Sequence, residues 1–361
     1  MRILFAAHAP WRGTGYGTPV IPMVKEWRLL EHQVDCLAVA ERGPGLMRYE
    51  DINVALPMIA KYGTDVVKDL VRMFKSDAII SMFDPWVLNG EDYSIAEKPW
   101  YAWFPIDQDV LIDGMSKLVS NMAQAVVYSQ YAADRLPGAV VIEPPIEVDV
   151  FTPGDKAQAK RKMGMDPDTK IIGMVGSNLR GDRKALEVQV RAFAAFAQGK
   201  PDYKLVMLVN PFGDVALIDL IESLGMRGQV LFVDPFAQFY PLSDHSRLVE
   251  IYRAFDVLLH ASAAEGFGMC IAEAMACGVP VIYANNTSQP EVTGGLGYAV
   301  TDMQAQPSPF GGQWNYPTID GLVDALERWD KSEPIDASML REHVLQYAPV
   351  NIAAKWQEVL G

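Results

Sequence analysis

Residues 256–281, DVLLHASAAEGFGMCIAEAMACGVPV, decide the fold of this chain. A short apolar run ends at His260, as expected for a central strand that is buried on both faces. A loop of small residues follows, and a helix is predicted over Met269 to Cys277. Glycine and proline come soon after it, as they commonly do after a helix C-terminus. The segment therefore predicts a strand, a glycine-rich loop and a helix, which are the parts of an α/β unit.

The glycine-rich loop, Glu265 to Gly268, lies between that strand and that helix. Unpaired N–H groups and the positive end of the helix dipole meet at such a point, so the loop favours an anion such as a diphosphate. A carboxylate at Glu265 suits sugar hydroxyls and is poorly suited to phosphate. Side chains in a helix lean toward its N-terminus, so Glu273 can reach a hydroxylated group beside the anion.

The rest of the chain alternates strand-like and helix-like runs, which predicts parallel sheets covered by helices on both faces. A proline-rich stretch, residues 143–154, separates two such series, and we place a domain boundary there. The predicted strands of the first series are Ile3–Ala7, Val34–Val39, Ala78–Met82, Trp100–Phe104, Ala125–Tyr128 and Val140–Ile142. Those of the second are Ile171–Val175, Leu205–Val209, Val230–Val233, Val257–His260 and Val279–Tyr283.

Length and composition are those of a folded chain with two domains: 361 residues, half of them hydrophobic. The net charge of −14 argues against tight non-specific binding to nucleic acid. No apolar run is long enough for a transmembrane span. The three cysteines, Cys36, Cys270 and Cys277, show neither a disulfide framework nor a metal-ligand spacing. We therefore expect a cytoplasmic protein.

Several motifs in a fixed order resemble the retaining GT-B glycosyltransferases, in particular glycosyltransferase family 4. Glu265 and Glu273 have the spacing of that family's E-x7-E motif. The resemblance covers most of residues 120–300, and several ordered motifs are more specific than one alone. The further matching stretches are Ser129–Leu136, Gln289–Val292 and, more loosely, Pro145–Pro153.

The resemblance implies a GT-B fold, in which two Rossmann-like domains face each other across a cleft. Residues 1–145 would form the N-terminal domain, which binds the acceptor. Residues 155–345 would form the C-terminal domain, which binds the nucleotide-sugar donor. The helical end of the chain, residues 350–361, would return to the N-terminal domain.

The family resemblance also implies a reaction: retaining transfer of a sugar from a UDP- or GDP-linked donor, without a cofactor and without a metal. Lysine and arginine would stabilise the departing diphosphate, and Glu265 with the loop amides would hold the sugar. The catalytic candidates are Glu265, Asp107, Lys184 and Arg183. The donor-binding candidates are Gly15, Gly17, Ser177, Arg180, Gly266, Phe267, Gly268 and Glu273.

Two of these assignments stay open in the sequence. Lys184 matches the family lysine by its spacing, whereas Arg183 and Arg180 are both candidates for the arginine. Asp107 stands near the place of a family histidine that contacts the sugar, and it also begins a D-x-D pattern with Asp109. Such a pattern holds a divalent metal in the other large glycosyltransferase fold, but that fold lacks both the two-domain arrangement and the E-x7-E motif. A loop-capping aspartate is the structural alternative.

Two other functions remain compatible with the sequence. The glycines of residues 13–17 could belong to a nicotinamide-dependent oxidoreductase, although G-x-G-x-G is not the full dinucleotide pattern. A non-catalytic nucleotide-sugar-binding protein is the other alternative. For a transferase, the acceptor could be a small molecule, a glycan, a lipid or a modified nucleic acid.

Overall fold

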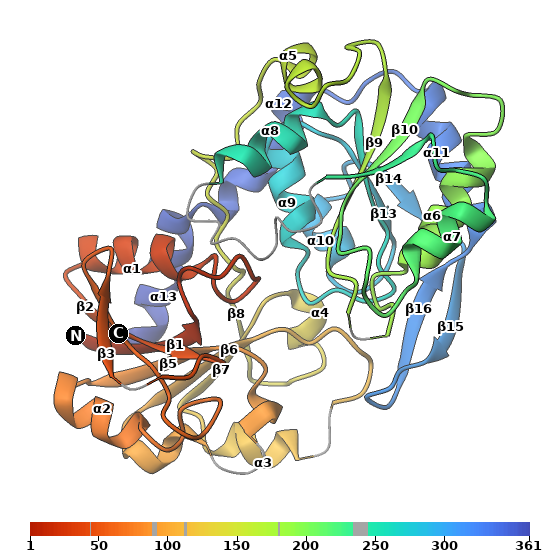
Figure 1. Cartoon of the computed structure of the whole chain (residues 1–361). Coiled ribbons are helices and arrows are strands. Elements are labelled where there is room, and N and C mark those ends of the chain that lie inside the picture. The colour runs from red at the N-terminus through yellow and green to blue at the C-terminus, as the bar shows by residue number, and fades with distance from the viewer. Residues whose placement is uncertain (44, 89–91, 112–113, 180, 234–244) are drawn as a thin grey trace.

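The structure is a computed structural model that describes residues 1–43, 45–88, 92–111, 114–179, 181–233 and 245–361. Most of its strands form two mainly parallel sheets, each with helices on both faces (Figure 1). The first sheet contains β1 (Arg2–His8), β2 (Gln33–Val39), β3 (Leu46–Tyr49), β4 (Ile52–Ala55), β5 (Ala78–Met82), β6 (Trp100–Phe104), β7 (Gln124–Val127) and β8 (Val140–Val141). The second contains β9 (Lys170–Val175), β10 (Tyr203–Leu208), β11 (Val230–Phe232), β12 (Val257–His260), β13 (Val281–Ala284) and β14 (Tyr298–Val300), and β15 (Met303–Pro307) with β16 (Gln313–Pro317) forms a separate antiparallel hairpin.

The helices lie mainly between successive strands, as the alternating pattern predicted. They are α1 (Val20–Leu29), α2 (Val67–Phe74), α3 (Met115–Ser120), α4 (Gln130–Ala133), α5 (Lys156–Lys162), α6 (Leu186–Phe196), α7 (Leu217–Ser223), α8 (Ser246–Ala254), α9 (Met269–Ala276), α10 (Gln289–Thr293), α11 (Ile319–Lys331), α12 (Ala337–Val344) and α13 (Pro349–Leu360). The described ranges also contain short 3-10 helices, η1 (Pro85–Leu88), η2 (Tyr93–Ala96) and η4 (Leu345–Tyr347).

Every predicted strand overlaps a strand of the structure, so the predicted α/β class is confirmed. The central strand β12 is buried along its whole length, as its apolar run implied. The central strand β5 is also fully buried. The structure adds β3, β4, β14 and the β15–β16 hairpin, which the sequence did not predict.

The order of strands places one reversal point in each sheet. The second sheet runs β11-β10-β9-β12-β13-β14, so the order reverses between β9 and β12. The first runs β3-β4-β2-β1-β5-β6-β7-β8 and reverses between β1 and β5. Ligands of doubly wound sheets bind outside the carboxyl ends of the strands at such a point. The fold therefore singles out the loops that follow β1, β5, β9 and β12.

The chain crosses from one sheet to the other twice. Residues 143–154 run without helix or strand between β8 and α5. At the end of the chain, α13 returns and packs beside α1 of the first sheet (Figure 1). Its Trp356 ring centroid lies 6.0 Å from that of Trp27 and 5.3 Å from that of Trp103. The exact division of the chain into domains at 145 and 155 stays a prediction.

Replacing Trp356 with leucine is expected to destabilise the protein by roughly 2–3 kcal/mol, because the smaller side chain leaves a cavity among buried aromatic rings. Trp356 is fully buried. Urea unfolding followed by circular dichroism measures the change. Val350→Ala is the matched control on the same helix: Val350 is 58% exposed, so its free energy of unfolding should change by less than about 0.5 kcal/mol. Equal effects of the two substitutions would contradict the packing role of α13.

Candidate active site

The candidate site lies where the carboxyl edges of the two sheets meet. Lys184 follows β9 and Glu265 follows β12, the two strands at the reversal point of the second sheet. Asp107 follows β6 of the first sheet. The guanidinium Nη1 of Arg183 lies 3.2 Å from Oδ2 of Asp107, so the two edges are in contact. Four residues predicted as catalytic are thus brought together: Lys184, Arg183, Glu265 and Asp107.

Glu265 is the centre of a buried polar network. Only 4% of the residue is exposed. Its Oε1 accepts hydrogen bonds from Lys184 Nζ, from His260 Nε2 at 2.8 Å and from Ser262 Oγ at 2.8 Å. Its Oε2 lies 3.6 Å from Arg183 Nη1. One carboxylate therefore contacts both Lys184 and Arg183, the latter being one of the two arginines considered for the diphosphate.

The pKa of Glu265 reflects two opposing effects. Burial disfavours the charged carboxylate, which raises the pKa. The charge of Lys184, the hydrogen bond from His260 and the charge of Arg183 oppose it, and the pKa ends well below its usual range. Glu265 is accordingly ionised at neutral pH and available as a hydrogen-bond acceptor.

Arg183 connects the two edges. Its Nη1 donates to the carbonyl oxygen of Ala264 at 2.6 Å and pairs with Asp107. Burial lowers the pKa of Arg183, but the carboxylates of Asp107 and Glu265 outweigh that effect and raise it. Asp107 therefore contacts an arginine in this structure. Asp109 has another partner, since its Oδ1 accepts a hydrogen bond from the hydroxyl of Tyr131 at 3.0 Å. The two aspartates of the D-x-D pattern thus have different partners.

The loop of Gly266, Phe267 and Gly268 is closely packed. A Cβ atom at Gly266 would lie well inside van der Waals contact of Pro105 Cβ, across the junction between the sheets. Gly268 caps the N-terminus of α9 with a φ of +108°, which favours glycine. Phe267 is buried, with its ring centroid 5.1 Å from that of Tyr347. The Phe267 side chain thus packs in the core.

Glu273 belongs to a second set of contacts on α9. Its Oε2 accepts a hydrogen bond from the Tyr252 hydroxyl at 2.7 Å, and 7% of the residue is exposed. Burial, the largest effect, raises the pKa of Glu273, and the Tyr252 hydrogen bond opposes that rise. The predicted contact of Glu273 with ribose hydroxyls stays a prediction, since Tyr252 occupies one of its oxygens here.

Three further donor-binding candidates, Gly15, Gly17 and Ser177, lie on two loops. Gly17 is buried in a tight turn, where a Cβ atom would collide with the carbonyl of Arg12. Gly15 is exposed, and a Cβ atom there would lie 3.8 Å from Sδ of Met269, the first residue of α9. The glycine loop of the first sheet thus lies against the N-terminus of α9. Ser177 is exposed beyond the end of β9, and Arg180 lies outside the described residues.

Three polar residues described at this junction, His260, Ser262 and Asp84, were not singled out from the sequence. His260 and Ser262 both contact Glu265, as given above. Asp84 follows β5 and accepts a hydrogen bond from the Tyr16 hydroxyl at 2.7 Å. The signal that could have found them was a polar residue at the end of an apolar strand, as His260 is in β12, or shortly after one, as Asp84 is after β5. His8, at the end of β1, lies 2.9 Å from the Thr14 hydroxyl, within the glycine loop.

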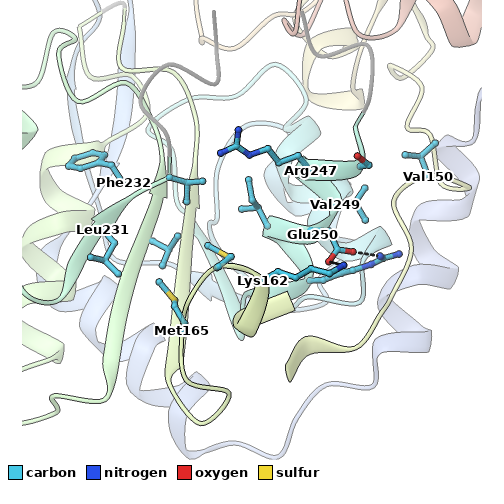
Figure 2. Close-up of a pocket in the computed structure, with 14 residues that line it drawn as sticks. Val150, Lys162, Met165, Leu231, Phe232, Arg247, Val249 and Glu250 are labelled. Carbon is cyan, nitrogen blue, oxygen red and sulfur yellow. Dashed lines mark hydrogen bonds and ion pairs between the residues drawn. The ribbon is translucent and has the colours of Figure 1, made fainter. Parts of the chain in front are cut away.

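A cavity of about 900 Å³ lies elsewhere, between α8, β10, β11 and the segment after α5 (Figure 2). None of its described lining residues is a predicted site residue. Lys162 and Arg253 on its rim already pair with Glu250, at 2.7 and 2.8 Å. Apolar side chains, among them Met165, Leu231 and Val249, also line it. No residue of the Glu265 network is among the described residues that line this cavity, and we locate the candidate site at that network.

Over the described ranges, no three His, Cys, Asp or Glu side chains form a group that could hold a metal ion. A search of the same ranges found no helix that is both long and apolar enough to cross a membrane. All three cysteines are free thiols.

Sequence comparison identifies the C-terminal part of the chain. Residues 155–298 match the family model described as Glycosyl transferases group 1. A D-inositol 3-phosphate glycosyltransferase of Rhodococcus jostii (strain RHA1) is 35% identical over 214 residues, which are 56% of this chain and 43% of the relative. D-inositol 3-phosphate glycosyltransferase 2 of Catenulispora acidiphila is 33% identical over 237 residues, 62% of this chain and 51% of the relative. The match thus spans about half the length of these curated relatives.

Structural comparison covers the whole chain. Sucrose-phosphate synthase from Thermosynechococcus elongatus superposes with a TM-score of 0.75 at 18% identity, over 99% of this chain and 98% of that one. Anabaena HepE, solved in complex with UDP and glucose, superposes with a TM-score of 0.71 at 18% identity, over 100% of this chain and 99% of that one. At this identity the likeness shows the fold alone, and that fold is GT-B. The chain therefore has the GT-B fold, and its residues 155–298 match the group 1 glycosyltransferase family.

Proposed function

We propose that this chain is a retaining, metal-independent glycosyltransferase that moves a sugar from a nucleotide-diphosphate donor to an acceptor hydroxyl. The observation that supports it is the convergence of Lys184, Arg183 and ionised Glu265 at the reversal point of the second sheet, facing Asp107. Two cations there can stabilise the charge that develops as a diphosphate departs. The carboxylate can accept hydrogen bonds from sugar hydroxyls. The retaining outcome rests on the family resemblance.

The donor is proposed to be UDP- or GDP-linked. Its diphosphate would lie at the N-terminus of α9, where backbone N–H groups and the helix dipole favour an anion. Glu273, on the same helix, would hold the ribose hydroxyls. The similar Anabaena HepE was solved with UDP and glucose and with UDP-glucose, which supports a uridine donor as the first one to test.

The acceptor is proposed only as a hydroxyl compound, whether small molecule, glycan, lipid or modified nucleic acid. The sequence relatives carry the name D-inositol 3-phosphate glycosyltransferase, so inositol phosphates belong among the first acceptors to assay. We also propose a cytoplasmic location, because three free cysteines suit a reducing compartment.

The test begins with a thermal-shift screen of the purified chain against UDP, GDP, ADP, their sugar conjugates and NAD. A true donor in excess should raise the Tm, since a ligand at about 100 times its Kd stabilises the folded state by about 2.7 kcal/mol. Glu273→Gln should abolish most of that shift. Glu222→Gln on α7, an exposed glutamate of the same size, is the control and should keep it.

Each outcome of the screen separates one function from another. A shift with a sugar nucleotide, followed by turnover that EDTA leaves unchanged, supports the proposal. A shift with NAD alone would favour the oxidoreductase instead. Donor binding with neither hydrolysis nor transfer would favour the non-catalytic binding protein.

A further inference from the structure

The carboxylate of Glu265 has one oxygen that is already fully occupied. Lys184, His260 and Ser262 all donate to Oε1. A carboxylate oxygen accepts about two hydrogen bonds through its lone pairs, so three donors leave no capacity on Oε1. Among the residues that the structure describes, the cation beside Oε2 is Arg183, whose Nη1 lies 3.6 Å away. Only Oε2 can therefore accept a hydrogen bond from an arriving sugar hydroxyl.

His260 is the most constrained of the three donors. It ends β12, and 3% of the residue is exposed. Its Nδ1 lies 3.1 Å from the carbonyl oxygen of Val175, the last residue of the neighbouring strand β9. Its Nε2 lies 2.8 Å from Glu265 Oε1. The rigid ring thus connects the ends of β9 and β12, the two strands at the reversal point, to the carboxylate.

Ser262 supports the same oxygen from two residues further along the loop. Its hydroxyl donates to Oε1 at 2.8 Å, and the residue is 1% exposed. Lys184 has a long, flexible side chain, whereas the serine and histidine side chains have few rotatable bonds. The carboxylate is therefore oriented by Ser262 and His260, and Lys184 is held by the carboxylate.

We propose that His260 and Ser262 are positioning residues for sugar transfer and act through Glu265. By occupying Oε1 they present Oε2 to the transferred sugar, and they hold the Lys184 ammonium where it meets the leaving diphosphate. This inference rests on the proposed function. It requires neither residue to touch the substrate, which distinguishes both from Glu265 and Lys184.

The test compares His260→Gln with His260→Leu in the full chain. The glutamine amide can place an N–H near the position of Nε2 and so keep the bond to Oε1, whereas leucine cannot. We expect His260→Leu to lower kcat about 10- to 100-fold, since a displacement of 1 Å in an active site can cost about 10²-fold. KM for the donor should change less than about threefold. His260→Gln should recover kcat to within about fivefold of the wild type.

A loss of kcat that is equal in the two variants would overturn the proposal, because a merely structural histidine is not rescued by an amide donor. If His260→Leu fails to fold, Ser262→Ala tests the proposal in its place. We expect Ser262→Ala to lower kcat three- to tenfold with unchanged Tm and donor affinity. An unchanged kcat would overturn the proposal. The turnover of the wild-type chain distinguishes a failure of this inference from a failure of the proposed function. A wild-type chain that turns over no sugar nucleotide refutes the function itself, before any variant is compared.

Discussion

Lys184→Ala is expected to lower kcat for sugar transfer about 10²- to 10³-fold while the chain stays folded. The ammonium bonds Glu265 and is only 15% exposed, at the place where the diphosphate is proposed to leave. Removing one pre-organised donor from a site that stabilises developing negative charge typically costs this much. Steady-state kinetics with the donor found in the thermal-shift screen measures it.

The matched control is Lys162→Ala on α5. Lys162 also pairs with a glutamate, Glu250 at 2.7 Å, but it lies on the rim of the cavity away from the site. Its kcat should stay within about twofold of the wild type, because an exposed ion pair contributes little. Equal kinetics for the two variants would remove Lys184 from the mechanism. A large loss of Tm for Lys184→Ala alone would instead mark the lysine as structural.

The segment that decides the fold was predictable because its signals are local. The strand Val257–His260 was predicted with the bounds that the structure has, and the helix predicted over Met269–Cys277 ends one residue earlier. Within a few residues the sequence shows an apolar run, a glycine-rich loop and a glycine just after the helix. Because the strand is buried on both faces, its residues form a continuous apolar run rather than alternating between apolar and polar.

Two of the unpredicted strands, β3 and β15, lack those signals. β3 lies at the edge of its sheet with exposed side chains, and β15 is exposed along nearly its whole length. Neither shows the apolar run or the apolar–polar alternation from which a strand is inferred. Their pairing is set by neighbouring strands rather than by their own burial.

The sequence singled out some residues of the candidate site, but not the contacts between them. Glu265 and Lys184 are 81 positions apart, and only the folded chain places one against the other. The choice between Arg183 and Arg180 depended in the same way on tertiary contacts, and the structure shows those of Arg183 with Asp107 and Glu265. His260 was predicted only as the last residue of a strand, because nothing local shows which acceptor its ring will face.

Gly266→Ala is expected to lower kcat/KM about 10²-fold by separating the two edges of the site. The new Cβ atom would collide with Pro105 Cβ, a ring atom next to the backbone that cannot simply rotate away. The Arg183–Asp107 pair crosses the same junction at 3.2 Å, so any separation there also disturbs the catalytic set. A displacement of about 1 Å is enough for a loss of this size. The Tm should fall only slightly, because the collision lies between the sheets rather than inside either core.

A second substitution tests whether the collision is the cause. Pro105→Gly removes the Cβ atom that meets the new methyl group, so the double variant Gly266→Ala/Pro105→Gly should recover most of the activity lost in Gly266→Ala. Pro105→Gly alone measures the cost of a more flexible loop, and the two single variants with the double variant form a cycle that isolates their coupling. Strong positive coupling is expected because the two side chains meet directly. Additive losses would show that Gly266 is required for its own backbone conformation or for substrate contact, and not for closure against Pro105.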